Sequence, residues 1–169
     1  MKDTLSDSLT RLRNSSRVKR PTVLLPSTHA TKSITKLLKR EGYIDEVLEI
    51  PAIVQGRGVA SPYAERSPAR DLGGSFPVGL DTKNPPNHRH YRPAQLQIRL
   101  KYEGKKMRPS FSHIQRISTP GVRKYAQSNT IPQVLGGLGL IVLSTSQGVM
   151  TDTEARTLNI GGELLFSIW

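Results

Sequence analysis

The sequence of 169 residues contains no cysteine. Disulfide bonds, thiolate nucleophiles, iron–sulfur clusters and zinc sites with sulfur ligands are therefore excluded. Aromatic residues make up only 5% of the chain and hydrophobic residues 36%, so the core must be modest and mainly aliphatic. The longest nearly apolar run, 138–143, is too short to cross a bilayer, and the N-terminus lacks the apolar segment of a secretory signal. We therefore expect an intracellular protein with no membrane partner.

The chain carries a large excess of positive charge, which is unevenly distributed. There are 25 Lys and Arg residues against 13 Asp and Glu, giving a net charge of +12 and a pI near 10.4. Residues 1–51 carry +4 and residues 52–116 carry +8, whereas residues 117–169 are neutral. Such an excess predicts a polyanionic partner, although positive charge that only maintains solubility stays an alternative. The neutral part must recognise its partner by shape and hydrogen bonds.

The first half of the sequence alternates helical and strand patterns. A helix is expected from Thr4, with Asp7 as its capping partner and with Leu5, Leu9 and Leu12 on one face. The other expected elements are a strand at 23–25, a helix from Thr28 or Thr31 that ends before Gly42, and strands at 47–50 and 96–100. Residues 52–94 hold six Pro and five Gly, and predict an irregular insertion in a β-hairpin.

The second half predicts a β-rich structure. We expect strands at 114–117, 140–143 and 164–169, a turn at 118–121 and a tight bend at 136–139. Thr151 and Glu154 have capping-box spacing for a short helix, with Ala155 and Leu158 facing inward and Gly161-Gly162 as its stop. The predicted fold class is α+β. An N-terminal α-β-α-β-β domain (1–112) precedes a small antiparallel β domain with one short helix (113–169).

The run Ser144-Thr145-Ser146-Gln147-Gly148 is the main candidate for chemistry. A hydrolase nucleophile elbow needs glycine two residues before the serine and a helix after it, and Ser146 has neither. Hydroxyl groups both donate and accept hydrogen bonds, so the run suits ribose and base edges of RNA, with an ordinary turn as the alternative. His88-Arg89-His90 lacks carboxylates and makes a poor metal site. We predict no catalytic residue, metal, cofactor or small-molecule substrate.

Several motifs occur in an order that is typical of one known family. They are residues 3–14, Pro120-Gly121-Val122-Arg123 with Tyr125, residues 131–152, Glu154-Ala155-Arg156, and Gly161-Gly162-Glu163 with Trp169. Together they cover nearly the whole chain apart from 52–94. The sequence thereby resembles the S8 family of small-subunit ribosomal proteins.

The resemblance implies a structural ribosomal protein, not an enzyme, that supports subunit assembly and translation. Its implied partners are small-subunit ribosomal RNA, bound directly at an irregular helix of the central domain, and neighbouring small-subunit ribosomal proteins. The C-terminal domain would make most specific contacts, chiefly through the Ser-Thr-Ser loop. The RNA-binding residues carried over from the family are Thr4, Arg13, Asn14, Pro120, Gly121, Arg123, Tyr125, Ser144, Thr145, Ser146, Gly148, Gly162 and Glu163.

The sequence also departs from the family pattern. Thr119, Gln147 and Thr153 stand where the family commonly has Lys or Arg, and we expect the 52–94 insertion and the region 99–116 to supply the missing charge. Phrases at 38–44, 131–132 and 141–143 look more like plastid than bacterial relatives. They predict a ribosome of the plastid (chloroplast), with the bacterial cytoplasm as the alternative. An extraribosomal RNA-binding translational repressor and a hydrolase that uses Ser146 are the competing functions.

Overall fold

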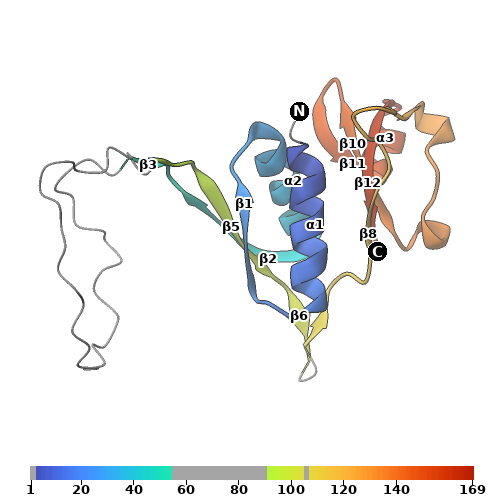
Figure 1. Ribbon diagram of the computed structural model, residues 1–169. Helices are drawn as coiled ribbons and strands as arrows, with labels where there is room; N and C mark the ends of the chain where they lie inside the picture. The colour runs from blue at the N-terminus through green and yellow to red at the C-terminus, as the bar shows by residue number, and fades with distance from the viewer. Residues whose placement is uncertain (1–2, 55–90, 105–106) are drawn as a thin grey trace, which may run out of the picture. The chain divides into compact units, whose positions relative to one another are not determined.

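The computed structural model describes residues 3–54, 91–104 and 107–169 of the chain. They belong to two compact units, one formed by residues 1–51 with 94–169 and the other by residues 52–93. In the second unit, β3 (Ile53–Val54) and β4 (Tyr91–Arg92) form an antiparallel pair (Figure 1). Most of the predicted insertion, including His88-Arg89-His90, lies outside the described residues.

An antiparallel sheet of three strands forms one layer of the larger unit. Its order is β1-β5-β2, with β1 at Thr22–Pro26, β2 at Ile44–Ile50 and β5 at Gln95–Leu100. Strands β2 and β5 pair in an antiparallel manner, with Val47 opposite Ile98, and the insertion of 52–94 into this hairpin stays a prediction. Val23 and Ile98 lie opposite each other on the buried face, whereas Leu24 and Leu48 lie on the exposed face. Alternation along the strands therefore gives the sheet one apolar side.

Two amphipathic helices cover that apolar side. They are α1 (Thr4–Arg17) and α2 (His29–Arg40). The capping box of α2, formed by Thr28 and Thr31, confirms its predicted start. The predicted cap of α1 is wrong: Asp3 is the N-cap and its carboxylate accepts a hydrogen bond from the Ser6 amide, whereas Asp7 forms an ion pair with Arg11. A carboxylate at the N-cap accepts a hydrogen bond from an otherwise unpaired amide. Its negative charge also interacts favourably with the positive end of the helix dipole.

The second sheet is antiparallel and comes from the C-terminal third. Its strands are β8 (Ile114–Arg116), β9 (Tyr125–Ala126), β10 (Leu140–Thr145), β11 (Gly148–Thr151) and β12 (Gly162–Ile168). Their order is β11-β10-β12-β8, and β9 also pairs with β12. A short hairpin of β6 (Tyr102–Glu103) and β7 (Arg108–Pro109) lies between the two sheets in the sequence. Two 3-10 helices, at Ser128–Thr130 and Leu135–Gly137, connect β9 to β10. Helix α3 (Asp152–Thr157) connects β11 to β12.

Helix α3 starts as predicted but ends differently. The capping box of Thr151 and Glu154 is present, and Ala155 is buried. Leu158, predicted to face inward, is 53% exposed because it caps the C-terminus of the helix. The helix ends at Thr157, well before Gly161-Gly162, and Asn159, the residue after the C-cap, has a φ of 56°. Asparagine tolerates this left-handed conformation well, so it replaces the glycine that usually ends a helix.

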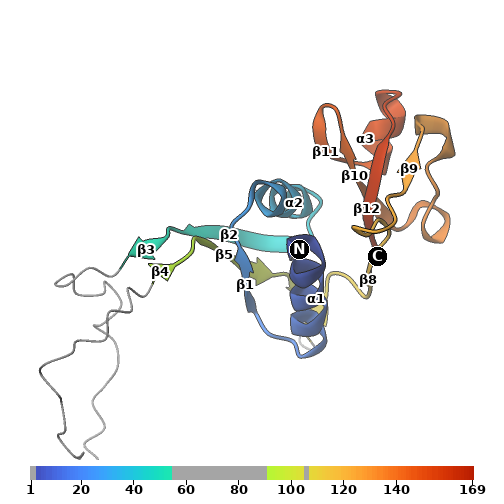
Figure 2. The same cartoon turned by 45° about the horizontal axis from the view of Figure 1, so that its top comes forward.

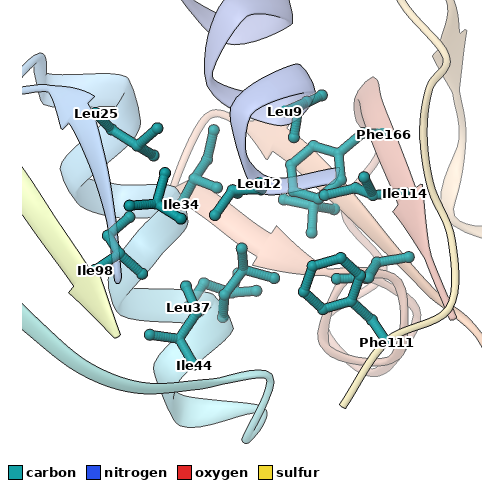
Figure 3. Packing of buried hydrophobic residues seen from close by; sticks show 14 of the residues in the cluster. Leu9, Leu12, Leu25, Ile34, Leu37, Ile44, Ile98, Phe111, Ile114 and Phe166 are labelled. Atoms are coloured by element: carbon teal, nitrogen blue, oxygen red, sulfur yellow. The ribbon is translucent and has the colours of Figure 1, made fainter. Parts of the chain in front are cut away.

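The main hydrophobic cluster lies between the two sheets. Helix α1 packs against β1 and β8, and α2 against β2 and β11, so the helices form a middle layer (Figures 1 and 2). Leu9, Ile98 and Phe166 contribute to this cluster from a helix and from each sheet (Figure 3). Phe111 and Ile114, which flank the predicted domain boundary between residues 112 and 113, are both buried in it. That boundary separates the strands of the two sheets, and it stays a prediction.

A second, smaller cluster lies on the other face of the C-terminal sheet. Ile141 and Leu143 of β10 belong to it, whereas Leu140 and Val142 belong to the main cluster. Strand β10 is thus buried on both faces, which explains its uninterrupted apolar sequence. The structure confirms the α+β class, with an α-β-α-β-β half followed by an antiparallel sheet and a short helix.

We expect Phe166→Ala to lower the free energy of unfolding by about 3–5 kcal/mol, because the fully buried ring leaves a cavity at the centre of the main cluster. Leu138→Ala is the control, since Leu138 is 86% exposed and its removal should cost less than about 0.5 kcal/mol. Urea denaturation of both variants measures the difference. Equal urea midpoints for the two variants would place Phe166 outside the core.

Candidate nucleic-acid interface

The β10–β11 hairpin presents the predicted Ser-Thr-Ser loop. Thr145 and Gly148 form its last pair, and Ser146 lies exposed in the turn. The Thr145 hydroxyl donates to the Gly148 carbonyl at 3.0 Å and accepts from the Gln147 amide at 3.2 Å. Gly148 has a φ of 115°, which side chains rarely allow. Thr145 and Gly148 therefore hold the turn in shape, and Ser146 presents its hydroxyl to solvent.

Gly162 allows the hairpin to lie against β12. A Cβ atom at this position would overlap the carbonyl oxygen of Ser144 and come within 2.9 Å of the Thr145 side chain. Any larger residue would therefore push Ser144 away from its partner strand. This steric role is sufficient to explain the glycine, and its predicted contact with RNA stays a prediction.

A row of three predicted residues crosses the sheet. Tyr125 of β9 pairs with Glu163 of β12, which in turn pairs with Ser144 of β10. Directly paired residues on antiparallel strands share one face of the sheet. Tyr125 is 71% exposed, whereas Ser144 and Glu163 are half-buried. The pairing therefore places an exposed aromatic ring, a carboxylate and a hydroxyl along one line.

The carboxylate of Glu163 organises the turn that leads into β9. It accepts hydrogen bonds from the buried Ser118 hydroxyl and from Nη1 of Arg123, the latter at 2.6 Å. Partial burial raises the pKa of Glu163, but these two hydrogen bonds and the positive charge of Arg123 outweigh burial, so the pKa lies below its ordinary value of 4.5. Glu163 is therefore ionised at neutral pH and serves to hold Arg123.

The turn predicted at 118–121 is present one residue later, at 119–122, and carries two more of the predicted residues. Thr119 and Val122 exchange backbone hydrogen bonds of 3.0 and 3.1 Å, which close the turn. Pro120 and Gly121 lie at its tip and are exposed. Because the turn is fixed at both ends, its tip can form a rigid contact surface.

Arg116 connects this turn to the start of helix α1. Its Nη1 donates to the Asp3 carboxylate at 2.7 Å and to the Ser6 hydroxyl at 2.9 Å, and its Nε donates to the Ser118 carbonyl. The side chain is only 11% exposed. Partial burial raises the pKa of Asp3, but the hydrogen bonds from Arg116 and Ser6 lower it more, so Asp3 is also held in its ionised form. The pair therefore joins segments that are more than a hundred residues apart in sequence.

These connections bring residues from both ends of the chain around one hollow of about 320 Å³. Four predicted residues line it, namely Thr4, Pro120, Arg123 and Ser144, above apolar side chains that include Ile34 and Leu165. Ser146 lies on the same hairpin as Ser144, and Tyr125 lies in the row described above. We call these six residues the candidate RNA surface: Thr4, Pro120, Arg123, Tyr125, Ser144 and Ser146.

Two predicted residues lie away from this surface. Arg13 donates from Nε and Nη2 to the carbonyl of Ile114, at 3.1 and 2.5 Å, and so ties α1 to β8. Asn14 is exposed ten residues along α1 from Thr4, which is about 15 Å at 1.5 Å per residue. Sequence analysis did not identify Asp3 or Ser118 as important, and it expected Arg116 only to supply positive charge. Asp3 had a local signal, because an acidic residue three positions before Ser6 is a good N-cap, but the partners of Arg116 and Ser118 are distant in sequence.

The competing chemistries gain no support from the described residues. Within 3–54, 91–104 and 107–169, no group of three or more His, Asp or Glu side chains could hold a metal ion. Nor does any imidazole in these ranges form a hydrogen bond with Ser146. No helix in the described part of the chain is long and apolar enough to cross a membrane.

Comparison with known proteins gives matches over almost the full length. The family model described as "Ribosomal protein S8" matches residues 3–169. The small ribosomal subunit protein uS8c of Guillardia theta is 40% identical over 167 residues, which cover 99% of this chain and 98% of the relative. The uS8 proteins of Microcystis aeruginosa and of a Synechocystis strain are each 38% identical, covering 99% of this chain and 97% of theirs.

We expect Glu163→Gln to destabilise the protein at pH 7, and the loss to shrink as the pH falls towards 3. The lowered pKa means that ionised Glu163 stabilises the fold above about pH 4.5, and that this contribution disappears as the pH falls through the folded-state pKa. Urea denaturation of wild type and variant at pH 7, 5 and 3.5 measures the difference.

Glu46→Gln provides the control, because it removes the same charge from an exposed position on β2. Its effect should stay below about 0.5 kcal/mol at each pH. A loss for Glu163→Gln that is equal at all three pH values would contradict the role assigned to its charge.

Proposed function

The chain belongs to the ribosomal protein S8 family, and from this membership we propose that it is a structural component of the small ribosomal subunit that binds the subunit's RNA directly. The proposed site is the candidate RNA surface, and the proposed target is an irregular helix in the central domain of that RNA. The observation that carries the proposal is the meeting of Thr4, Pro120, Arg123 and Ser144 around one hollow, although they lie far apart in sequence.

The hydroxyl groups suit recognition of an RNA helix. The deep major groove of A-form RNA does not admit side chains, whereas its shallow minor groove displays ribose hydroxyls and base edges. Ser146 is exposed at a turn whose shape Thr145 and Gly148 fix, so its hydroxyl can approach closely without reordering the loop. A serine hydroxyl can donate to a base edge or accept from a ribose 2′-OH.

Arg123 and Tyr125 add two other kinds of contact. The guanidinium of Arg123 has five N–H donors, and its hydrogen bond to Glu163 involves Nη1, so donors remain that can face a phosphate. Tyr125 presents an exposed ring two residues after Arg123 in the chain. Stacking of an unpaired base on such a ring contributes about 1–3 kcal/mol where it has been measured.

The charge missing from this surface must come from elsewhere. Thr119 and Gln147 are exposed here as neutral residues. Arg116, which was expected to help to compensate, is not available, because it is nearly buried and bonded to Asp3. We propose that cations outside the surface provide the general attraction to RNA and that its hydroxyl and backbone groups provide the specific contacts.

We also propose that the protein belongs to a plastid ribosome. Support comes from the plastid-like phrases at 38–44 and 141–143 and from 40% identity to the protein named uS8c in Guillardia theta. In a cell with plastids, the protein should co-sediment with small ribosomal subunits from purified plastids. Its recovery only with cytosolic subunits would contradict this location.

The RNA-binding proposal predicts that two substitutions change different properties of binding. Ser146→Ala should lower affinity about fivefold, the equivalent of about 1 kcal/mol for one hydrogen bond, with no change in salt dependence because no charge is lost. Arg123→Gln should lower the slope of log K against log salt by about 0.7–0.9, as expected for one phosphate contact. Filter-binding titrations on a central-domain helix at several salt concentrations measure both properties.

The control for these variants is Gln97→Ala on β5, on the opposite sheet, which should leave affinity and slope unchanged. Equal binding of wild-type protein to an unrelated RNA duplex would show that recognition is not specific. An unchanged affinity of Ser146→Ala, together with an unchanged slope of Arg123→Gln, would remove the proposed surface from RNA binding.

A further inference from the structure

Strand β2 lies at an edge of the three-stranded sheet. The order β1-β5-β2 leaves one side of β2 without a partner strand in the described part of the chain. In that part, the backbone of 46–50 forms hydrogen bonds only with β5. An unpaired edge presents a regular series of backbone N–H and C=O groups, which another extended chain can bind. The edge of β2 is therefore open to a further strand.

The opposite edge of the sheet is blocked. Strand β1 follows Pro21 and ends at Pro26, and proline has no N–H group to donate to an added strand. Strand β2 contains no proline in its seven residues. Its register with β5 shifts between Ile44 and Glu46, so 46–50 is its regular part. Of the two edges, only that of β2 suits strand addition.

Helix α2 lies over β2, and the two elements enclose a groove of about 270 Å³, which we call the α2–β2 groove (Figure 2). Lys32, Lys36 and Lys39 line it from one stripe of the helix, because their spacings are four and three residues. Val47 of β2 and the buried Leu96 of β5 line it from the sheet. The stripe is about 10 Å long, which matches three residues of an extended chain.

The groove carries positive charge that the fold does not neutralise. Lys32 forms an ion pair with Glu49. Lys36 and Lys39 are exposed, and within the described ranges neither lies within 4 Å of a carboxylate oxygen. Like charges three or four residues apart on a helix repel each other. Carboxylates brought into the groove would remove this repulsion.

We propose that the α2–β2 groove binds an extended acidic segment of another protein, which adds as a strand to the free edge of β2. The backbone of this segment pairs with 46–50, and its carboxylates, on alternate residues, lie beside Lys36 and Lys39. The side chains between them cover Leu48, which is 52% exposed on the other face of the sheet. A nucleic-acid backbone has no matching series of donors and acceptors, so the edge favours a peptide. This interaction goes beyond the proposed function and does not require RNA.

The probe is a synthetic peptide that alternates glutamate with valine over eight residues, so that all its carboxylates share one face. Amide hydrogen exchange of the full chain, followed residue by residue by NMR, measures strand addition. In the free protein, the amides of every second residue in 46–50 point away from β5 and should exchange fast. Saturating peptide should slow them about tenfold and leave the amides of β1 unchanged.

Three outcomes of this experiment would overturn the proposal. Slow exchange of those amides in the free protein would mean that another part of the chain, or a second copy of it, already covers the edge. Unchanged exchange with the peptide present would mean that no strand is added. Equal slowing along β1 would mean general stabilisation without strand addition.

Two control peptides separate strand pairing from charge. The same peptide with a methyl group on every amide nitrogen keeps its charge but has no backbone donor, and it should not bind. A peptide with lysine in place of glutamate keeps its donors but reverses the charge, and it should not bind either. Binding of the methylated peptide as tight as that of the probe would overturn strand addition, and equal binding of the lysine peptide would overturn the role of charge.

Substitutions in the protein locate the site. Lys36→Gln with Lys39→Gln should lower the affinity for the labelled probe, measured by fluorescence polarisation, about fivefold, because two partly exposed ion pairs are lost. Arg17→Gln with Arg20→Gln removes the same charge outside the groove and should not change it. Equal losses for both double variants would mean general attraction and would overturn the site.

Binding to the central-domain RNA helix distinguishes this proposal from the proposed function. The double variant of Lys36 and Lys39 should bind that RNA as the wild type does. If it weakens RNA binding and leaves peptide binding unchanged, the groove is a contact for RNA and the peptide proposal is overturned. Failure of the peptide to bind, with RNA binding intact, would overturn the groove proposal and leave the proposed function standing.

Discussion

The guanidinium group of Arg116 is the contact on which the candidate RNA surface depends. A nearly buried charge is stable only when it is paired and its hydrogen-bond donors are satisfied, and Arg116 meets both conditions through Asp3, Ser6 and the Ser118 carbonyl. Asp3 is at the same time the cap of α1. One ion pair therefore sets the start of a helix, the end of β8 and the entry to the next turn.

A series of hydrogen bonds connects Arg116 to Arg123. Arg116 holds the Ser118 carbonyl, the Ser118 hydroxyl donates to Glu163, and Glu163 holds Arg123. Each group in this series would cost free energy if it were buried without a partner. The series therefore favours one arrangement of the Arg123 side chain. Glu163 also pairs with Ser144 of β10 and with Tyr125 of β9, so Arg123 is held next to these two residues. A prearranged surface loses less conformational entropy when it binds a ligand.

The sequence allowed the regular parts of the fold to be predicted, because their causes are local. Alternation and helical periodicity located the main strands and helices, and the three-residue spacing of Thr151 and Glu154 located the cap of α3. Contacts between distant residues left no such signal. The pairing of Arg116 with Asp3 and of Arg13 with the Ile114 carbonyl depends on how α1 lies against β8. The prediction that Leu158 faces inward was wrong, because apolar periodicity does not show where a short helix stops.

The resemblance to a family named the residues of the candidate surface. It did not distinguish residues that would bind RNA from residues that the fold itself requires. Gly148 and Gly162 were both carried over as RNA-binding residues, yet one adopts a φ of 115° and the other leaves space for the Ser144 carbonyl. Either requirement explains a glycine without any ligand. Ser146 is different, because its exposed hydroxyl has no partner that would fix it within the described part of the chain. The residues most directly available to RNA are therefore those that the fold itself leaves unused.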